Sequence, residues 1–267
     1  MDDEDIPTWE PPRDTKIDDA VPRVMRIFEE SPTRVFYSTQ IETALEREFF
    51  HWITNKALVE SADAKRLQRI PDIIQGNNLN FYAHIRHRYW RREQQSIRTL
   101  LERIFNPEFA QALGRHAEMM FDSAFARNGF AIAAKDVKSW NAKTWVQTNH
   151  NLDRIVIRDG IAYGVEIKNT QNYIGHEELN TKLRLCDYLG LTPLFVMRFA
   201  PKSYMNQIAQ AKGFGLLFDD QIYPWGHSSL LAEVRDRLGL KVAAPRDIPE
   251  GHMYRLVAWH RKKVQRS

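Results

Sequence analysis

A chain of 267 residues with 43% hydrophobic and 27% charged side chains has the composition of a soluble globular protein, which excludes wholesale disorder. Its length predicts two domains, each large enough to bury its own core. No run of about 18 apolar residues occurs, and the N-terminus is acidic where a secretory signal would be basic, so we expect a cytoplasmic protein without a membrane span. The single cysteine, Cys186, excludes an intrachain disulfide and a cysteine metal cluster.

The net charge of +4 is unevenly distributed along the chain. Residues 1–19 carry eight acidic and two basic side chains, a net charge of −6, which leaves +10 on the remaining 248 residues. A positive surface attracts polyanions such as nucleic acids whatever their sequence. The acidic segment also holds three prolines, and we expect it to be a disordered tail over residues 1–19.

The chain after the tail predicts three short helices and then a basic strand. Apolar residues recur at helical spacing over 21–30, again after a capping serine or threonine at 38–39, and again over 48–61. Segment 80–92 begins with the alternation of a strand and ends in a run of arginine and aromatic side chains. The outward face of the third helix is expected to hold His51, Asn55 and Lys56.

This order of elements over about residues 20–93 resembles a winged helix-turn-helix module. In that family the third helix enters the major groove and the strands that follow contact phosphates. The resemblance implies duplex DNA as the partner, and guanidinium groups suit it because they pair with phosphate in a bidentate manner. A small helical domain that makes only protein contacts is the alternative. The residues expected to contact DNA are Asn55, Lys56, Arg86, Arg88, Arg91 and Arg92.

The second half of the chain alternates helices with strands. A helix from about residue 94 leads to Asn106–Pro107 and is expected to link two domains over 94–107. The alternation that follows predicts an α/β fold, a mixed sheet covered by helices. Its expected elements are a helix (108–128), strands (145–158 and 161–168), a helix (176–189), a strand (193–199), a helix (203–212) and a strand (214–218).

Two of these strands are expected to form a hairpin that opposes two carboxylates. Asp159–Gly160 favours a two-residue turn because both positions tolerate a positive φ. With that turn, Asp153 lies directly across from Glu166, and such opposed side chains have Cβ atoms roughly 4.5–5.5 Å apart. Lys168 is two residues beyond Glu166 and therefore shares its face of the sheet.

Opposed carboxylates repel each other and need a compensating charge. Mg²⁺ takes hard oxygen ligands, usually one or two carboxylates with water and a substrate phosphate. A bound metal can activate water, and a neighbouring lysine can orient that water or hold the phosphate. The alternative is that Asp153 and Glu166 pair with Lys168 or Arg154 on a solvated face. The valines and isoleucines around them favour a buried hairpin and hence a metal.

These residues resemble the PD-(D/E)XK nuclease superfamily, which has the restriction-endonuclease-like fold. Members carry an Asp at the start of one strand and Glu-x-Lys on the next, here Asp153 and Glu166-Ile167-Lys168, with Leu152 where the family signature has proline. Glu118 occupies the place of a further family glutamate on the preceding helix, unless it is an ordinary surface residue. The resemblance covers about residues 108–220.

The resemblance implies a metal-dependent DNA endonuclease, restriction-like or repair-like, on an α/β/α domain. Glu118, Asp153 and Glu166 would hold one or two Mg²⁺ ions, or Mn²⁺, and Lys168 would act on the attacking water. The alternatives are a structure-selective junction or repair nuclease, an RNA target, and a non-catalytic DNA-binding regulator on the same scaffold. Since cutting a duplex often takes two active sites, a homodimer is a further expectation.

The expected organisation thus has five parts. The chain would comprise an acidic tail (1–19), a winged-helix-like DNA-binding domain (20–93), a linker helix (94–107), the nuclease domain (108–220) and a C-terminal extension (221–267). For the extension, a second basic contact through residues 260–263 is the only functional expectation.

Overall fold

The computed structural model describes residues 14–265, and these residues form two units. Unit 1 runs to Asp72 and resumes over Leu79–Gln94, whereas unit 2 comprises Ile73–Asn78 and the chain from Gln95 onward. Helices and strands occur in both, and the larger sheet mixes parallel with antiparallel strands, which confirms the α/β class. Within the described residues no helix is long and apolar enough to cross a membrane.

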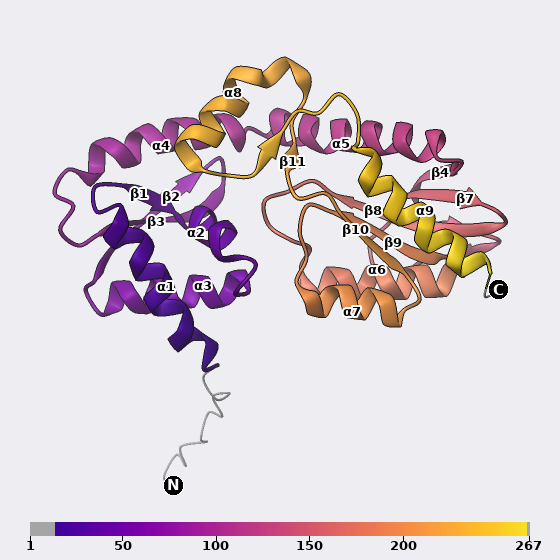
Figure 1. Ribbon diagram of the computed structural model, residues 1–267, viewed down its shortest axis with the longest axis horizontal. Coiled ribbons are helices and arrows are strands. Elements are labelled where there is room, and N and C mark those ends of the chain that lie inside the picture. The colour runs from indigo at the N-terminus through magenta and orange to yellow at the C-terminus, as the bar shows by residue number, and fades with distance from the viewer. Residues whose placement is uncertain (1–13, 266–267) are drawn as a thin grey trace, which may run out of the picture. The chain divides into compact units, whose positions relative to one another are not determined.

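Unit 1 packs three helices against a three-stranded sheet with the strand order β1, β3, β2 (Figure 1). Its core includes Phe28 of the first helix, Leu58 of the third helix and Tyr82 of the sheet. A turn at Gln75 and Gly76, both with positive φ, joins β2 to β3. The elements are α1 (Lys16–Glu30), β1 (Val35–Tyr37), α2 (Ser38–Leu45), α3 (His51–Asp63), β2 (Leu67–Ile74) and β3 (Asn77–His84).

Three features of this unit differ from expectation. Residues 1–13 lie outside the described part of the chain, and α1 begins at Lys16, so the expected tail extends too far. Strand β2 lies in a segment with no strand pattern, because Pro71 and charged residues interrupt it; a proline is tolerated at the edge of a sheet. The basic strand ends at His84, and the next helix, α4, begins at Trp90.

Unit 2 is built around a five-stranded sheet with the order β10, β9, β8, β7, β4. Strands β4, β7 and β8 are antiparallel neighbours, and β8, β9 and β10 run parallel. Helices α5 and α9 cover one face, and α6 and α7 cover the other (Figure 1). Helix α4 (Trp90–Ile104) begins in unit 1 and continues into unit 2. The other elements are α5 (Pro107–Arg127), β4 (Ala131–Val137), β7 (Leu152–Arg158), β8 (Ile161–Lys168), α6 (His176–Leu189), β9 (Thr192–Met197), α7 (Lys202–Gln210), β10 (Phe214–Leu217) and α9 (Glu250–Val264).

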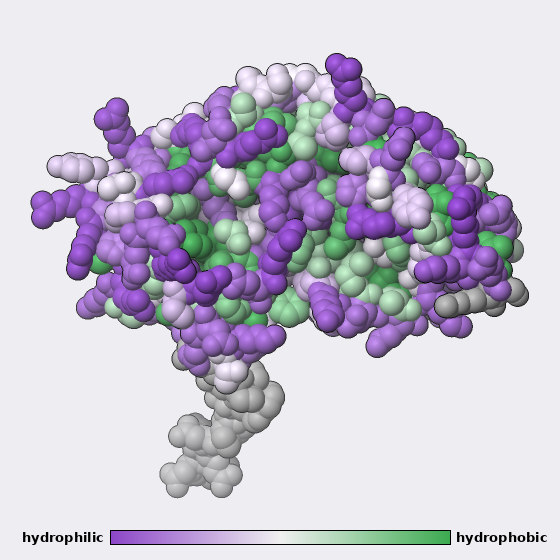
Figure 2. Space-filling view, viewed as in Figure 1, coloured by the Kyte–Doolittle hydropathy of each residue, from purple (hydrophilic) through white to green (hydrophobic). Residues whose placement is uncertain are grey.

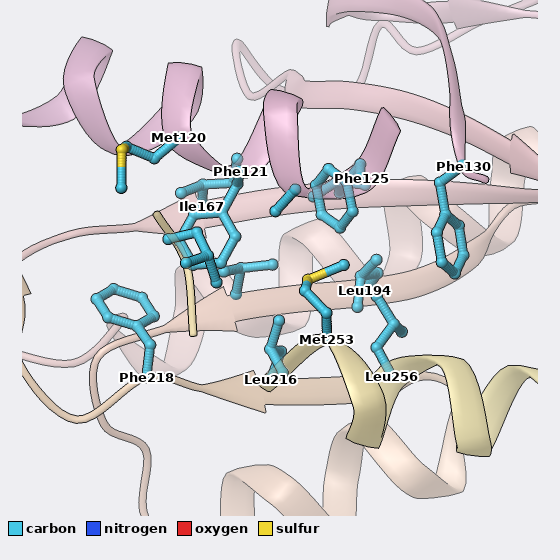
Figure 3. Close-up of a cluster of buried hydrophobic side chains, with 14 of the residues drawn as sticks. Met120, Phe121, Phe125, Phe130, Ile167, Leu194, Leu216, Phe218, Met253 and Leu256 are labelled. Carbon is cyan, nitrogen blue, oxygen red and sulfur yellow. The ribbon is translucent and has the colours of Figure 1, made fainter. Parts of the chain in front are cut away.

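The core on the α5 side fixes β8 in place. Phe121 and Phe125 of α5 pack over Ile167 of β8, and Met253 and Leu256 of α9 complete the cluster (Figure 3). Burying each such side chain contributes about 1.5–3 kcal/mol. The side-chain oxygen of the residue before α5 accepts hydrogen bonds from two amides of its first turn, which sets where that helix begins.

Two expectations for unit 2 are corrected. The sheet begins with β4, a strand missed because its small and charged residues alternate weakly and a bulge between Ile132 and Ala134 interrupts it. Helix α9, which lies in the expected C-terminal extension, contributes Met253 and Leu256 to the main core. The remaining elements are β5 (Ser139–Trp140), β6 (Lys143–Thr144), β11 (Gln221–Ile222), β12 (Val242–Ala243), α8 (Ser228–Glu233), a 3₁₀ turn (Trp225–His227) and a π-helical turn (Val234–Leu238).

Candidate active site

The hairpin formed by β7 and β8 has the register expected from its turn. Asp159 and Gly160 have φ angles of 48° and 74°, the left-handed conformation that this turn requires. The pairing runs from Arg158 with Ile161 to Arg154 with Val165. Continuing the same register, Asp153 lies across from Glu166.

The Asp153 side chain bonds to β8 just beyond the last residue pair of the hairpin, Arg154 with Val165. Its Oδ2 accepts a hydrogen bond of 2.6 Å from the backbone N–H of Ile167, so the carboxylate is fixed against β8. Burial raises the pKa of Asp153, and the negative charge of Glu118 raises it further. The charges of Glu118 and Asp153 are therefore close enough to interact.

Glu166 is the most deeply buried of the expected site residues, with 4% of its surface exposed. Burial, and then the negative charge of Asp153, raise the pKa of Glu166 to about 7. The structure thus brings Asp153 and Glu166 together, as the hairpin argument predicts. Within residues 14–265, no group of three or more His, Cys, Asp or Glu side chains has the spacing of a metal site.

A lysine that the sequence analysis does not single out contacts this pair. Lys182 of α6 places its Nζ 2.6 Å from Glu166 Oε2, and its charge lowers the pKa of both carboxyl groups. The sequence does carry a signal for it. Lys182 occupies the same face of α6 as the buried Leu179 and Leu183, where a charged residue is unusual.

Lys168, the lysine of the sequence motif, has a different partner. Its Nζ lies 2.7 Å from Oε1 of Glu178, the residue one helical turn before Lys182 on α6. The alternative pairing of both carboxylates with Lys168 or Arg154 is therefore not what the structure has. Glu166 pairs with Lys182 instead.

Glu118 reaches the site from α5 with a partner of its own. The Nη2 of Arg154 lies 2.7 Å from Glu118 Oε2, and its Nε lies 2.9 Å from Asp122 Oδ1. The Arg154 side chain is nearly inaccessible, whereas 31% of the Glu118 side chain is exposed. Glu118 is thus a partly exposed carboxylate held at the edge of the site.

The donor set of this site suits a hard divalent cation. Asp153 and Glu166 supply the one or two carboxylates that Mg²⁺ takes from a protein, and their mutual repulsion is the penalty that a cation would relieve. The single ammonium of Lys182 balances only one of these two charges. The chemistry of the residues therefore fits Mg²⁺ or Mn²⁺.

The expected DNA-contacting residues of unit 1 divide into two groups. On α3, Lys56 is exposed, whereas Asn55 is half-buried and donates to Glu42 Oε1 at 3.0 Å. His51, which was expected on the same outward face, is buried. The exposed face of α3 also carries Trp52, which is 50% exposed. The sequence pattern placed His51 on the outward face, whereas it is the first residue of α3 and is buried.

The four arginines of unit 1 that are expected to contact DNA are all exposed. Arg86 and Arg88 lie in the turn after β3, and Arg91 and Arg92 lie in the first turn of α4 and not on a strand. Among the described residues none of the four makes an ion pair, and Arg91 stacks over the ring of Trp90 at 4.8 Å. Figure 2 shows hydrophilic side chains on the surface of unit 1.

Comparisons with protein families, with curated proteins and with solved structures find no match for this chain. No relative therefore assigns a role to any of these residues. What the chain does is inferred from the side chains of the site and their surroundings.

Proposed function

We propose that this chain is a metal-dependent DNA endonuclease of the PD-(D/E)XK type, with its active site on the hairpin of unit 2. The observation that carries the proposal is the pair of carboxylates on neighbouring strands, the half-buried Asp153 and the buried Glu166. Two like charges in a buried place are costly unless something compensates them. A divalent cation bound by these oxygens would offset the repulsion between the carboxylates and would also activate water for hydrolysis.

Each residue of the site has a part in this proposal. Asp153 and Glu166 would hold Mg²⁺ or Mn²⁺, with Glu118 as a further ligand that Arg154 keeps in place. When bound, the metal would activate a water molecule and stabilise the charge that builds up on the scissile phosphate. A lysine would steady Glu166 or that water, and Lys168 and Lys182 are the two that the chain offers.

We propose further that unit 1 holds double-stranded DNA as a winged helix-turn-helix module. Three helices followed by a two-stranded hairpin is the order of such a module, and α3 is its third helix. The exposed arginines lie just after the hairpin and have no carboxylate partner among the described residues, which leaves them available for phosphate. A homodimer would supply the two active sites that cutting both strands needs.

The test is cleavage by the full chain. Wild type and the variants Asp153→Asn and Glu166→Gln are incubated with supercoiled, linear, methylated and branched DNA and with RNA, in Mg²⁺, Mn²⁺ or EDTA. We expect metal-dependent cleavage of duplex DNA by wild type and a loss of about 100-fold or more in each variant. Glu177→Gln, an exposed carboxylate change on α6, is the matched control and should retain the wild-type rate.

The substrate panel also separates the forms of the proposal. Preference for methylated or unmodified linear duplex indicates a restriction-like enzyme, whereas preference for branched DNA indicates a junction or repair nuclease. Equal cleavage by wild type and by both site variants would show that Asp153 and Glu166 are not the site.

One observation favours a second candidate, a DNA-binding regulator on a nuclease-like scaffold. The cations Lys182, Lys168 and Arg154 already pair with Glu166, Glu178 and Glu118, so much of the negative charge is balanced without metal. A regulator would bind duplex DNA tightly in EDTA and in Mg²⁺ alike and cleave none of the substrates. A nuclease would instead cleave duplex DNA in Mg²⁺ and leave it intact in EDTA.

A further inference from the structure

Helix α6 presents two side chains of opposite charge to strand β8. Glu178 and Lys182 are four residues apart and share a face of the helix, as Glu166 and Lys168 share a face of the strand. Glu178 pairs with Lys168 at 2.7 Å, and Lys182 pairs with Glu166 at 2.6 Å. The two ion pairs form a short ladder of charges between the helix and the strand.

The two pairs differ in their exposure to water. The side chains of Lys168 and Glu178 are 29% and 28% exposed, whereas those of Lys182 and Glu166 are 5% and 6% exposed. A half-exposed pair is an ordinary contact between a helix and a sheet. Moving an ammonium group from water into the protein interior is costly, so the Nζ of Lys182 needs hydrogen-bonding partners close to it.

Lys182 has a second partner in the segment just before β7, the other strand of the hairpin. Its Nζ also donates a hydrogen bond to the backbone carbonyl of Asn151, which lies two residues before Asp153. One ammonium thus ties the segment that leads into Asp153 to the strand that carries Glu166. Among the described residues these two bonds use two of its three N–H groups, which leaves one for water or a phosphate oxygen.

We propose that Lys182 is the positioning lysine of the candidate active site. It holds Asp153 and Glu166 at a fixed separation. The Glu166 carboxylate would bind both the Lys182 ammonium and the divalent cation. Lys168, although it belongs to the sequence motif, fastens α6 to β8 through Glu178. This inference rests on the proposed nuclease function and decides which of the two lysines serves it.

The experiment compares lysine variants of the full chain by two measurements. The first is kcat and KM for cleavage of supercoiled plasmid in Mg²⁺, and the second is the Kd for Mn²⁺ measured by electron paramagnetic resonance without DNA. We expect Lys182→Met to lower kcat by about 100-fold with a smaller change in KM. Its Kd for Mn²⁺ should fall several-fold, because a cation that repels the metal has been removed.

Two other lysines give the comparison. Lys168→Met removes a charge from the same ladder and should lower kcat by less than about 10-fold. Lys202→Met, on an exposed turn of α7, should change neither measurement. Lys182→Gln keeps a donor for Asn151 and Glu166 without the charge, so it tests the same point if the methionine variant does not fold.

The outcomes separate this inference from the proposed function. If Lys168→Met loses about 100-fold in kcat while both Lys182 variants stay active, Lys182 is not the positioning lysine but the nuclease assignment stands. If the Lys182 variants lose Mn²⁺ affinity and activity together with their melting temperature, the role of Lys182 is structural and the inference is overturned. A wild type that neither cleaves DNA nor binds Mn²⁺ overturns both.

Discussion

Glu166 is the residue at which burial and charge act together most strongly in the candidate site. Burial and the charge of Asp153 raise the pKa of Glu166 to about 7, above its usual 4.5. The carboxyl group therefore binds its proton more tightly in the folded chain than in the unfolded one. Its contribution to stability is complete below pH 4.5 and is lost as the pH rises through about 7.

Metal-free protein should accordingly lose stability between about pH 5 and about pH 8, by an amount on the order of 3 kcal/mol from this group. Glu166→Gln cannot ionise there, so its free energy of unfolding should fall less over the same range. Urea unfolding at both pH values in EDTA measures the difference. Glu177→Gln should keep the wild-type dependence, and equal slopes for all three proteins would contradict the account.

At the residue scale, the sequence was sufficient where backbone geometry alone decides the outcome. A strand alternates its faces every residue, and Asp159–Gly160 fixes the register, so the convergence of Asp153 and Glu166 follows from counting. The side chains that pair with Asp153 and Glu166 cannot be found by counting along the strands. Lys182 meets Glu166 only because α6 packs on this face of the sheet, and no local pattern encodes that packing.

At the scale of elements, α9 is attached to the turn of the same hairpin by a buried histidine. His260 places Nδ1 2.6 Å from the hydroxyl of Tyr163 and Nε2 2.8 Å from Asp159 Oδ2. Burial raises the pKa of Tyr163, so the phenol remains protonated. Both ring nitrogens of His260 thus have a hydrogen-bonding partner.

Tyr163→Phe should destabilise the chain by about 1–3 kcal/mol, because it leaves a buried ring nitrogen of His260 without a partner. Urea unfolding at neutral pH measures this loss. Tyr89→Phe removes the same hydroxyl from a side chain that is 82% exposed and should have almost no effect. If the two variants were equally stable, the contact between α9 and the hairpin would contribute nothing.

Two of the strands that the sequence missed share a physical cause. Strands β2 and β4 both lie at the edge of a sheet, where half of each strand faces water and apolar alternation is weak. The central strands β7, β8 and β9 are buried and were recognised from their apolar runs. The helix α9 was missed as a core element because its buried residues, Met253, Leu256 and His260, are few and include a polar one.

At the scale of the whole molecule, the proposed function assigns DNA binding to the arginines of unit 1. The double variant Arg88→Ala/Arg92→Ala should weaken binding to duplex DNA of any sequence. It should also reduce the slope of log K against log salt concentration by about two, since two phosphate contacts are lost. Fluorescence anisotropy over a range of salt concentrations measures both effects.

Arg26→Ala is the matched control for this measurement. Arg26 is also an exposed arginine of unit 1, but its Nε already pairs with Glu30 at 2.8 Å. It should leave the salt slope at the wild-type value. A double variant that binds as the wild type does would remove this surface from the proposed DNA interface.

The two-unit organisation was predictable from the sequence only in outline. Unit 1 ends at Gln94, which lies inside α4 (Trp90–Ile104), so no helix start or turn in the sequence marks this boundary. The sequence could not show that Ile73–Asn78 groups with unit 2, since that depends on contacts between segments far apart in the chain.

The central claim is that Asp153 and Glu166 hold a divalent cation that cuts DNA. Its most direct test is the rate of cleavage of duplex DNA by the full chain, measured while Mg²⁺ is titrated, for wild type and for Glu166→Gln. The account predicts a wild-type rate that is zero in EDTA and rises to saturation with Mg²⁺, and a variant rate lower by about 100-fold or more at every Mg²⁺ concentration. A wild-type rate that does not depend on the metal, or a variant that follows the wild-type curve, would contradict it.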